Sequence, residues 1–250
     1  MKRANIVACF LILFVPRLTL SGQTGASTTR MSDAPTGVVI QKFARGDAIV
    51  IDTTGAGFHF SDPATSCVLF DLKGNGKPEC FSWPVAGSGN AWLVYDTGTG
   101  VVTNGTQLFT KFRPQPGHKS KNPSGYLALA EFDTNRDLVI DNKDEVWTHL
   151  RLWIDTHCAA QPGTTCVSLP SELYTLESRG IRSLGLVYGI GDKADEYGNH
   201  FRYYAPVNID TAKDDRQHST DAMERLTYDV FLATGPGGSG STSKNSSVEP

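Results

Sequence analysis

The sequence lacks the short motifs that identify two large classes of hydrolase, and it lacks a long apolar segment. It contains neither H-E-x-x-H, the zinc-protease helix, nor G-x-S-x-G, the nucleophile elbow of α/β-hydrolases. Beyond the N-terminus, no segment is apolar enough to span a bilayer. With 250 residues, 39% of them hydrophobic and 20% charged, the composition is that of an ordinary globular protein with one substantial domain or two small ones.

The N-terminus has the features of a secretory signal peptide. Lys2 and Arg3 precede an apolar run over residues 6–16, and small residues follow it. Because this run is too short for a transmembrane helix, we expect export to the periplasm, the cell surface or the medium. The expected organisation is a signal peptide over 1–22, a flexible lead-in over 23–46, a single domain over 47–233 and a disordered tail over 234–250.

The chain has no excess of basic residues. Its 23 Lys and Arg against 26 Asp and Glu give a formal charge of −3. Removal of residues 1–22 takes away three basic residues and no acidic one, which changes this charge to −6. A mildly acidic exported protein is a poor candidate for binding nucleic acid or anionic membranes.

Cysteine is scarce, and its distribution predicts disulfides. One of the five cysteines, Cys9, lies in the predicted signal peptide, and the remaining four are an even number in an oxidising compartment. No C-x₂₋₄-C spacing is present, which argues against a four-cysteine zinc site. Three pairings are open, and we favour the two local ones because each would join the ends of one turn: Cys67–Cys80 and Cys158–Cys166.

The stretch over residues 132–153 has the spacing of an EF-hand calcium loop. Such a loop places oxygen ligands at positions 1, 3, 5, 9 and 12 and a backbone carbonyl at position 7. Ile140, at position 8, is the apolar residue that the loop turns inward. Acidic groups this close repel one another unless a hard cation such as Ca²⁺ lies between them. The predicted ligands are Asp133, Asn135, Asp137, Val139 through its carbonyl, Asp141 and Asp144.

Two positions of this loop depart from the pattern. Position 6 is Leu138 instead of glycine, and a left-handed conformation costs a non-glycine residue roughly 1–2 kcal/mol. Position 12 is Asp144, which is shorter than the usual glutamate. The alternative interpretation is a surface turn that binds no ion, because Asp and Asn favour turns for their own hydrogen bonds.

A second candidate metal site follows the first. Asp155 and His157 lie at its start, and Glu172 follows the Cys158–Cys166 segment. Imidazole prefers borderline metals to Ca²⁺, and a glutamate at a helix N-terminus is also favourable without a metal. We therefore keep a plain helix start as the alternative.

Alternating apolar residues and turn signals predict an α+β fold. A strand pair with a glycine turn is expected over residues 67–83, and short helices are expected over 125–132, 144–150 and 171–177. We expect short antiparallel strands and hairpins with two or three short helices around the EF-hand-like loop.

Several motifs occur in an order that resembles a known family. They include D-x-x-G-x-G-F over residues 52–58, VLFDL-x-G-N-G over 68–76, GYLALAEFD over 125–133 and LRLWID over 150–155. The order is similar to that of secreted bacterial calcium-binding proteins related to EF-hand-like and hemolysin-type (RTX-associated) modules. The resemblance implies Ca²⁺ binding in an exported or cell-surface protein, and the loop over 133–144 matches its ligand pattern except at Leu138.

These features predict a secreted calcium-binding structural or interaction protein that is not an enzyme. One alternative is a secreted polysaccharide hydrolase with paired carboxylates. Another is a carbohydrate-binding or adhesive surface module with a glycan partner. That module would use tryptophans among Trp83, Trp92, Trp147 and Trp153. Trp147 and Trp153 lie in apolar periodic stretches and are expected in the core, whereas Trp83 and Trp92 lie at strand ends near turns, where either position is open.

Overall fold

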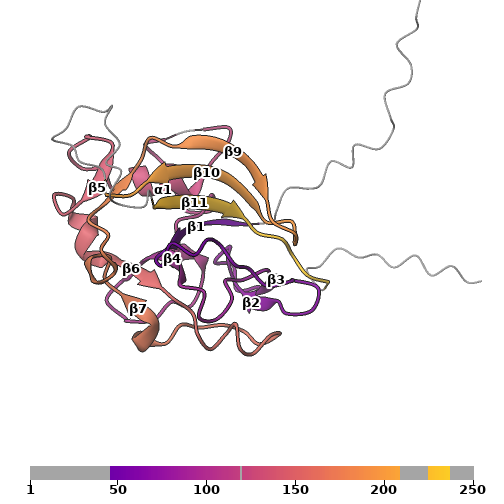
Figure 1. Cartoon of the computed structure of the whole chain (residues 1–250). Helices are drawn as coiled ribbons and strands as arrows, with labels where there is room; N and C mark the ends of the chain where they lie inside the picture. The colour runs from indigo at the N-terminus through magenta and orange to yellow at the C-terminus, as the bar shows by residue number, and fades with distance from the viewer. Residues whose placement is uncertain (1–45, 119, 209–224, 237–250) are drawn as a thin grey trace, which may run out of the picture. The chain divides into compact units, whose positions relative to one another are not determined.

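The strand β1 (Asp47–Asp52) lies inside a seven-stranded antiparallel sheet (Figure 1). The computed structural model describes residues 46–118, 120–208 and 225–236, which belong to one compact unit. The strand order is β7-β6-β4-β1-β11-β10-β9. β1 pairs with β4 on one side and with β11 on the other. The first and the last strand of the described chain therefore lie next to each other in the centre of the sheet.

The elements follow one another closely along the chain. The other strands of the large sheet are β4 (Asn90–Tyr95), β6 (Leu150–Trp153), β7 (Leu173–Tyr174), β9 (Gly189–Ala194), β10 (His200–Pro206) and β11 (Leu226–Phe231). Two smaller ladders pair β2 (Val68–Phe70) with β3 (Glu79–Phe81) and β5 (Val139–Asp141) with β8 (Ser183–Gly185). The helical elements are α1 (Gly125–Ala130) and the 3₁₀ helices η1 (Gly105–Gln107), η2 (Glu145–His149), η3 (Pro170–Glu172) and η4 (Glu177–Arg179).

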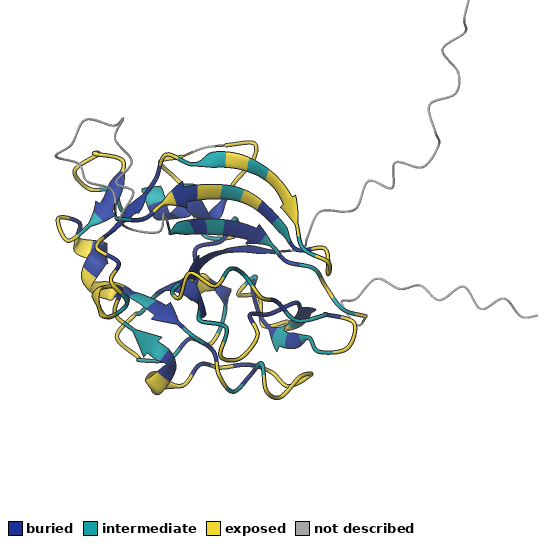
Figure 2. Ribbon diagram, in the orientation of Figure 1, coloured by how far each residue is buried: buried dark blue, intermediate teal, exposed yellow. Residues whose placement is uncertain are grey.

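Both faces of the central sheet are covered. Along β1, Ile49 and Ile51 belong to one hydrophobic cluster, whereas Ala48 and Val50 belong to the other. The first cluster includes side chains of α1 and of β5, and the second includes side chains of β2 and β3. Figure 2 shows the resulting burial of β1 and the exposure of much of β9. This arrangement explains why β1 is apolar on both faces, unlike a half-exposed strand.

All four tryptophans are core residues. The Trp83 ring lies 5.0 Å from that of Trp92 and 5.5 Å from that of Trp153, and Trp147 is only 6% exposed. Aromatic side chains bury a large area and strongly stabilise a core. The core position expected for Trp147 and Trp153 is confirmed. Trp83 and Trp92 are also fully buried, so a carbohydrate-binding surface could not use their rings without opening the core.

The prediction of an α+β fold with two or three helices is wrong, because the described chain is mostly β and has one α-helix. The segment 144–150 forms η2 and then enters β6, and the segment 171–177 is divided between η3, β7 and the start of η4. Short helices are costly to nucleate, and strand pairing satisfies the same backbone groups. Here the Ile154 amide donates to the Glu172 carbonyl (3.0 Å), which holds this segment at the edge of the sheet.

The two predicted disulfides are confirmed. Cys67 pairs with Cys80 (Cα–Cα 5.3 Å) and Cys158 with Cys166 (5.5 Å). The first pair joins the expected hairpin of β2 and β3. The predicted signal peptide lies outside the described residues. Within the described part, no helix is both long and apolar enough to cross a membrane.

A buried carboxyl pair lies between β1 and β11. Asp47 and Asp229 are diagonal neighbours on one face of this strand pair, and both are fully buried. Asp47 accepts the Lys111 amide (3.1 and 3.2 Å), and Asp229 Oδ2 accepts the Gly125 amide (2.7 Å). Asp229 Oδ1 has no donor among the described groups, which fits a proton shared by the two carboxyls.

Burial shifts the pKa values of this pair upward. It raises the pKa of Asp47 to about 6 despite the nearby charge of Lys111. Burial and the charge of Asp47 raise the pKa of Asp229 well above its ordinary value. The unfolded carboxyls ionise near pH 4, so the pair costs the folded state increasing stability as the pH rises beyond that value.

We therefore predict that Asp229→Asn stabilises the protein at pH 8. The amide retains an acceptor for the Gly125 N–H and donates to Asp47, while one buried charge is removed. The free energy of unfolding should rise by about 1–3 kcal/mol at pH 8, and the gain should shrink toward pH 4. Urea unfolding from pH 4 to pH 8 measures this difference in unfolding free energy, and Asp192→Asn at an exposed position is the control. If Asp229→Asn is less stable than the wild type at pH 8, the two carboxyls do not share a proton.

Candidate metal site

The central loop is held between α1 and β5. Ser124 caps α1 by accepting the Leu127 amide (3.2 Å), and the chain leaves the helix at Ala130. After the loop, β5 pairs with β8, and Ile140 is fully buried in the core. The inward position predicted for Ile140 is therefore confirmed, and it fixes the C-terminal half of the loop.

The backbone of the loop takes the conformation that its spacing predicts. Leu138 has φ 65° and Arg136 has φ 61°, both in the left-handed region. Leu138 is 55% exposed, so its side chain packs little against the protein in return for this strain. A non-glycine residue in this conformation costs about 1–2 kcal/mol, which the rest of the loop must offset.

The acidic side chains organise the loop by accepting backbone amides. Asp133 Oδ2 accepts from Leu138 (3.0 Å), Asn135 Oδ1 from Asp137 (3.1 Å), and Asp137 Oδ1 from Val139 (3.0 Å). Asn135 and Asp137 remain exposed, whereas Asp133 is half-buried. Each carboxylate oxygen has two lone pairs, so a bound cation can share them with the amides.

Asp144 closes the loop. Its Oδ1 accepts both the amide and the hydroxyl of Thr134 (2.9 Å each), and its Oδ2 accepts the Asp141 amide (3.1 Å). Asp144 is 2% exposed although η2, which it precedes, begins at the surface with Glu145. The shorter side chain therefore still joins the two ends of the loop.

One oxygen of the loop lacks a partner. Asp133 Oδ1 is buried and has no hydrogen-bond donor in the described part of the chain. A buried, unpartnered carboxylate oxygen is costly. A hard cation bound by the loop would remove that cost, and the oxygen donors are of the kind that Ca²⁺ takes, but the carboxylates of the described loop would have to move closer together to share one ion.

A lysine lies beside the same carboxylates. Lys143 Nζ is 2.8 Å from Asp141 Oδ2 and 3.7 Å from Asp137 Oδ2. Burial would raise the pKa of Asp141, but the hydrogen bonds and charge of Lys143 lower it below its ordinary value. The ammonium group therefore neutralises part of the charge that a cation would meet, and the two compete.

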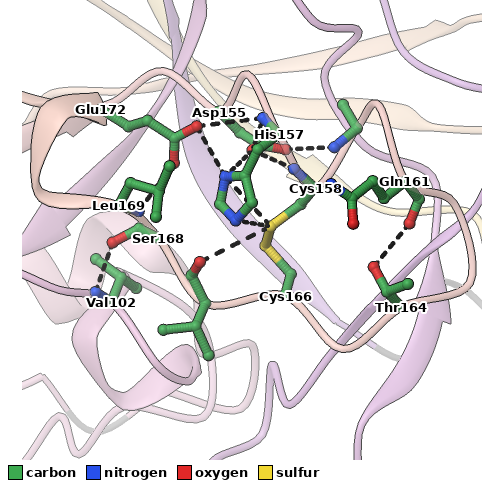
Figure 3. The surroundings of a disulfide bond; sticks show 12 residues. Val102, Asp155, His157, Cys158, Gln161, Thr164, Cys166, Ser168, Leu169 and Glu172 are labelled. Carbon is green, nitrogen blue, oxygen red and sulfur yellow. Dashed lines mark hydrogen bonds and ion pairs between the residues drawn. A yellow bond between two sulfur atoms is a disulfide. The ribbon is translucent and has the colours of Figure 1, made fainter.

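Among the described residues, the second predicted set of ligands comes together (Figure 3), whereas no three carboxylates of the 133–144 loop do. Ligand atoms of Asp155, His157 and Glu172 lie within 4.8 Å of one another. The imidazole Nδ1 lies 2.9 Å from Glu172 Oε1 and 3.5 Å from Asp155 Oδ1. The Cys158–Cys166 disulfide lies beside this ring, and its sulfurs are not free ligands.

The carboxylates of this second set are already well satisfied. Glu172 Oε1 accepts the amide and hydroxyl of Thr156 (2.7 Å each), and Oε2 accepts the Leu169 amide (3.0 Å) and Trp153 Nε1 (3.2 Å). Burial alone would raise the pKa of Glu172, but these bonds and that of His157 lower it to about 2. The pKa of Asp155 is instead raised by burial. The imidazole Nδ1 already pairs with Glu172 and faces Asp155, so a metal bound here would have to replace these contacts.

Other aspartates begin similar loops without the full ligand set. Asp71 accepts the amides of Asn75 (3.0 Å) and Gly76 (2.7 Å), and Lys73 pairs with Glu79 there. The interpretation of this segment as a turn fits that ion pair.

Sequence reasoning missed several structured acids. Asp52 and Asp195 also accept amides of their own loops, and glycines at positions 55 and 198 were an available signal. Nothing in the local sequence marks Asp47 and Asp229, because only the pairing of β1 with β11 brings them together.

Comparison with known proteins gives the family. The model of the SPM domain matches residues 49–223, which contain both candidate metal sites. The chain belongs to the SPM domain family. It is also similar to the iron-regulated protein FrpA of Neisseria meningitidis serogroup C, with 35% identity over 145 residues. That match covers 57% of this chain and 12% of FrpA. These comparisons do not test the resemblance to EF-hand-like and hemolysin-type calcium-binding proteins, which stays a prediction.

The second site generates a test of its internal bonding. Glu172→Gln replaces a carboxylate, which only accepts hydrogen bonds, with an amide. The amide NH₂ group would face donors such as the Thr156 amide or the Leu169 amide. The free energy of unfolding should therefore fall by about 2–3 kcal/mol at pH 7. Because the pKa of Glu172 is lowered to about 2, the wild-type advantage is complete above pH 4.5 and is lost toward pH 2. Urea unfolding measures this, with exposed Glu145→Gln as the matched control. An equal loss at pH 2 and 7 would contradict the charge effect.

Proposed function

We propose that this chain is an exported calcium-binding structural or interaction module whose ion site is the loop over residues 133–144. The observation that carries the proposal is the buried, unpartnered Oδ1 of Asp133 in a loop with EF-hand spacing. Asn135, Asp137, the Val139 carbonyl, Asp141 and Asp144 would supply the remaining oxygens.

The ion would act on the fold through this loop. Its charge would offset the repulsion of the carboxylates and the strain at Leu138, so binding free energy would appear as folding free energy. The loop joins α1 to β5, and both contribute to one hydrophobic cluster. Calcium would therefore stabilise the packing of this face of the sheet.

Export is the second part of the proposal. The predicted signal peptide supports it, and so do two disulfides, which persist in oxidising compartments and are rare in the cytosol. A secreted polysaccharide hydrolase has less support, because the paired carboxylates Asp47 and Asp229 are fully buried and no substrate could reach them in this conformation.

Calcium should raise the melting temperature of the purified, oxidised protein relative to the same protein with a chelator. At an ion concentration about 100 times Kd, the gain is roughly 2.7 kcal/mol. Asp133→Asn retains the acceptor for the Leu138 amide but removes the charge, so it should abolish most of the shift. Differential scanning calorimetry and titration calorimetry measure these effects, with Asp192→Asn as the control. No shift and no binding heat in the wild type would refute the proposal.

Lys143 gives a test in the opposite direction. Lys143→Gln removes the ammonium that competes for Asp137 and Asp141. Since exposed ion pairs contribute about 0–1 kcal/mol, calcium affinity should increase by about two- to fivefold. Titration calorimetry on Lys143→Gln and the exposed control Lys193→Gln measures the change. A weaker affinity in Lys143→Gln would show that the lysine does not oppose the ion.

A further inference from the structure

Arg113 is a cation held by aromatic rings instead of by an acid. The centre of its guanidinium group lies 5.1 Å from the ring centroid of Tyr95 and 5.2 Å from those of Phe109 and Phe132. One nitrogen, Nη1, donates to the Thr106 carbonyl (2.6 Å). No carboxylate of the described residues lies within ion-pair distance of it.

This arrangement leaves binding capacity unused. A guanidinium group carries five N–H donors, and Arg113 makes one hydrogen bond to the described residues. Burial lowers the pKa of Arg113, and the nearby Tyr95 raises it by a smaller amount. The net lowering indicates that the cation has lost much of its water. Aromatic faces recover part of that cost, and an anion would recover more.

The guanidinium borders two hollows of the surface. One has a volume of about 400 Å³ and the other about 490 Å³. The first has apolar walls from Phe112, Pro114, Pro116 and Phe132, and the charged residues Lys73 and Glu131 also line it. The second carries the basic side chains Lys111, His118 and Lys121. His118 pairs with Glu131, and Lys111 lies near the buried Asp47, so the positive charge of this cleft, formed by the two hollows, comes mainly from Arg113 and Lys121. That charge is complementary to an anionic partner.

The available donors favour a carboxylate over a phosphate. The backbone amides of Gly117 (2.9 and 3.1 Å) and His118 (3.0 Å) already donate to Glu131, so this loop has few amides left to surround a tetrahedral anion. At the centre, Arg113 retains the N–H groups of its planar fork that do not donate to Thr106, and the geometry of such a fork matches a planar carboxylate.

We propose that this cleft binds an acidic peptide segment of a partner protein. A carboxylate of the peptide meets the Arg113 guanidinium, and a neighbouring apolar side chain enters the hollow beside Phe112 and Phe132. Phe132 directly precedes Asp133, so calcium in the loop orders one wall of the cleft; this linkage, unlike the cleft itself, rests on the proposed function.

The experiment uses two blocked peptides, acetyl-Gly-Phe-Asp-Gly-amide and its neutral isostere acetyl-Gly-Phe-Asn-Gly-amide. Each is titrated into the ¹⁵N-labelled full chain while the Arg side-chain and backbone resonances are followed. The Asp peptide should shift the resonances of Arg113 and its neighbours and bind about tenfold more tightly than the Asn peptide. Arg113→Lys keeps the charge but loses the fork, and it should weaken binding of the Asp peptide about tenfold, whereas Arg202→Lys, an exposed control, should not.

Three results would overturn the proposal: equal binding of the two peptides, no shift of the wild-type resonances, or an equal response of Arg113 to inorganic phosphate. The comparison of the two peptides on the wild type needs no variant, so it holds even if Arg113→Lys fails to fold. Repeating the titration with chelator and with calcium separates the two proposals. Peptide binding that is the same in both conditions keeps the cleft and removes only its link to the loop.

Discussion

The loops of this protein depend on one interaction, in which an aspartate accepts backbone amides of the residues that follow it. Asp52, Asp71, Asp96, Asp133, Asp155 and Asp195 all do so. A carboxylate that accepts amides satisfies donors which a tight loop cannot pair with its own carbonyls. The same bonds concentrate negative charge at the loop, so each loop also needs a way to neutralise it.

The chain meets this need differently from loop to loop. Lys73 pairs with Glu79 near Asp71, Lys143 pairs with Asp141 in the central loop, and an imidazole lies between the acids of the second site. In the loop after Asp96 the residue Gln107 is neutral, and its amide oxygen accepts from Thr103 (2.8 and 3.1 Å). Among the described loops, only the central one combines the EF-hand spacing of oxygens with a buried, unpartnered carboxylate oxygen, which is why it is the strongest candidate for an ion.

How far the sequence predicts the structure depends on the range of each interaction. The left-handed backbone at Leu138, the β2–β3 hairpin and both disulfides depend on residues close together in the chain, so spacing and turn chemistry were sufficient to predict them. The helical content was overestimated because sheet pairing at Glu172 overrode a local helical pattern. The carboxyl pair of Asp47 and Asp229 and the ring cage around Arg113 join distant segments, and no local pattern encodes them.

The two candidate sites share one closing pattern. In each, an Asp-Thr pair begins the loop, the Thr amide and hydroxyl donate to the closing acid, and that acid exchanges bonds with the residue three positions before it. Between these shared ends the second loop carries the Cys158–Cys166 segment, where the first carries ion ligands. A covalent bond restricts a loop without a ligand, and His157 supplies a donor between the acids. The second loop can therefore keep the same closure without a metal, whereas the first has only a surface lysine to balance its charge.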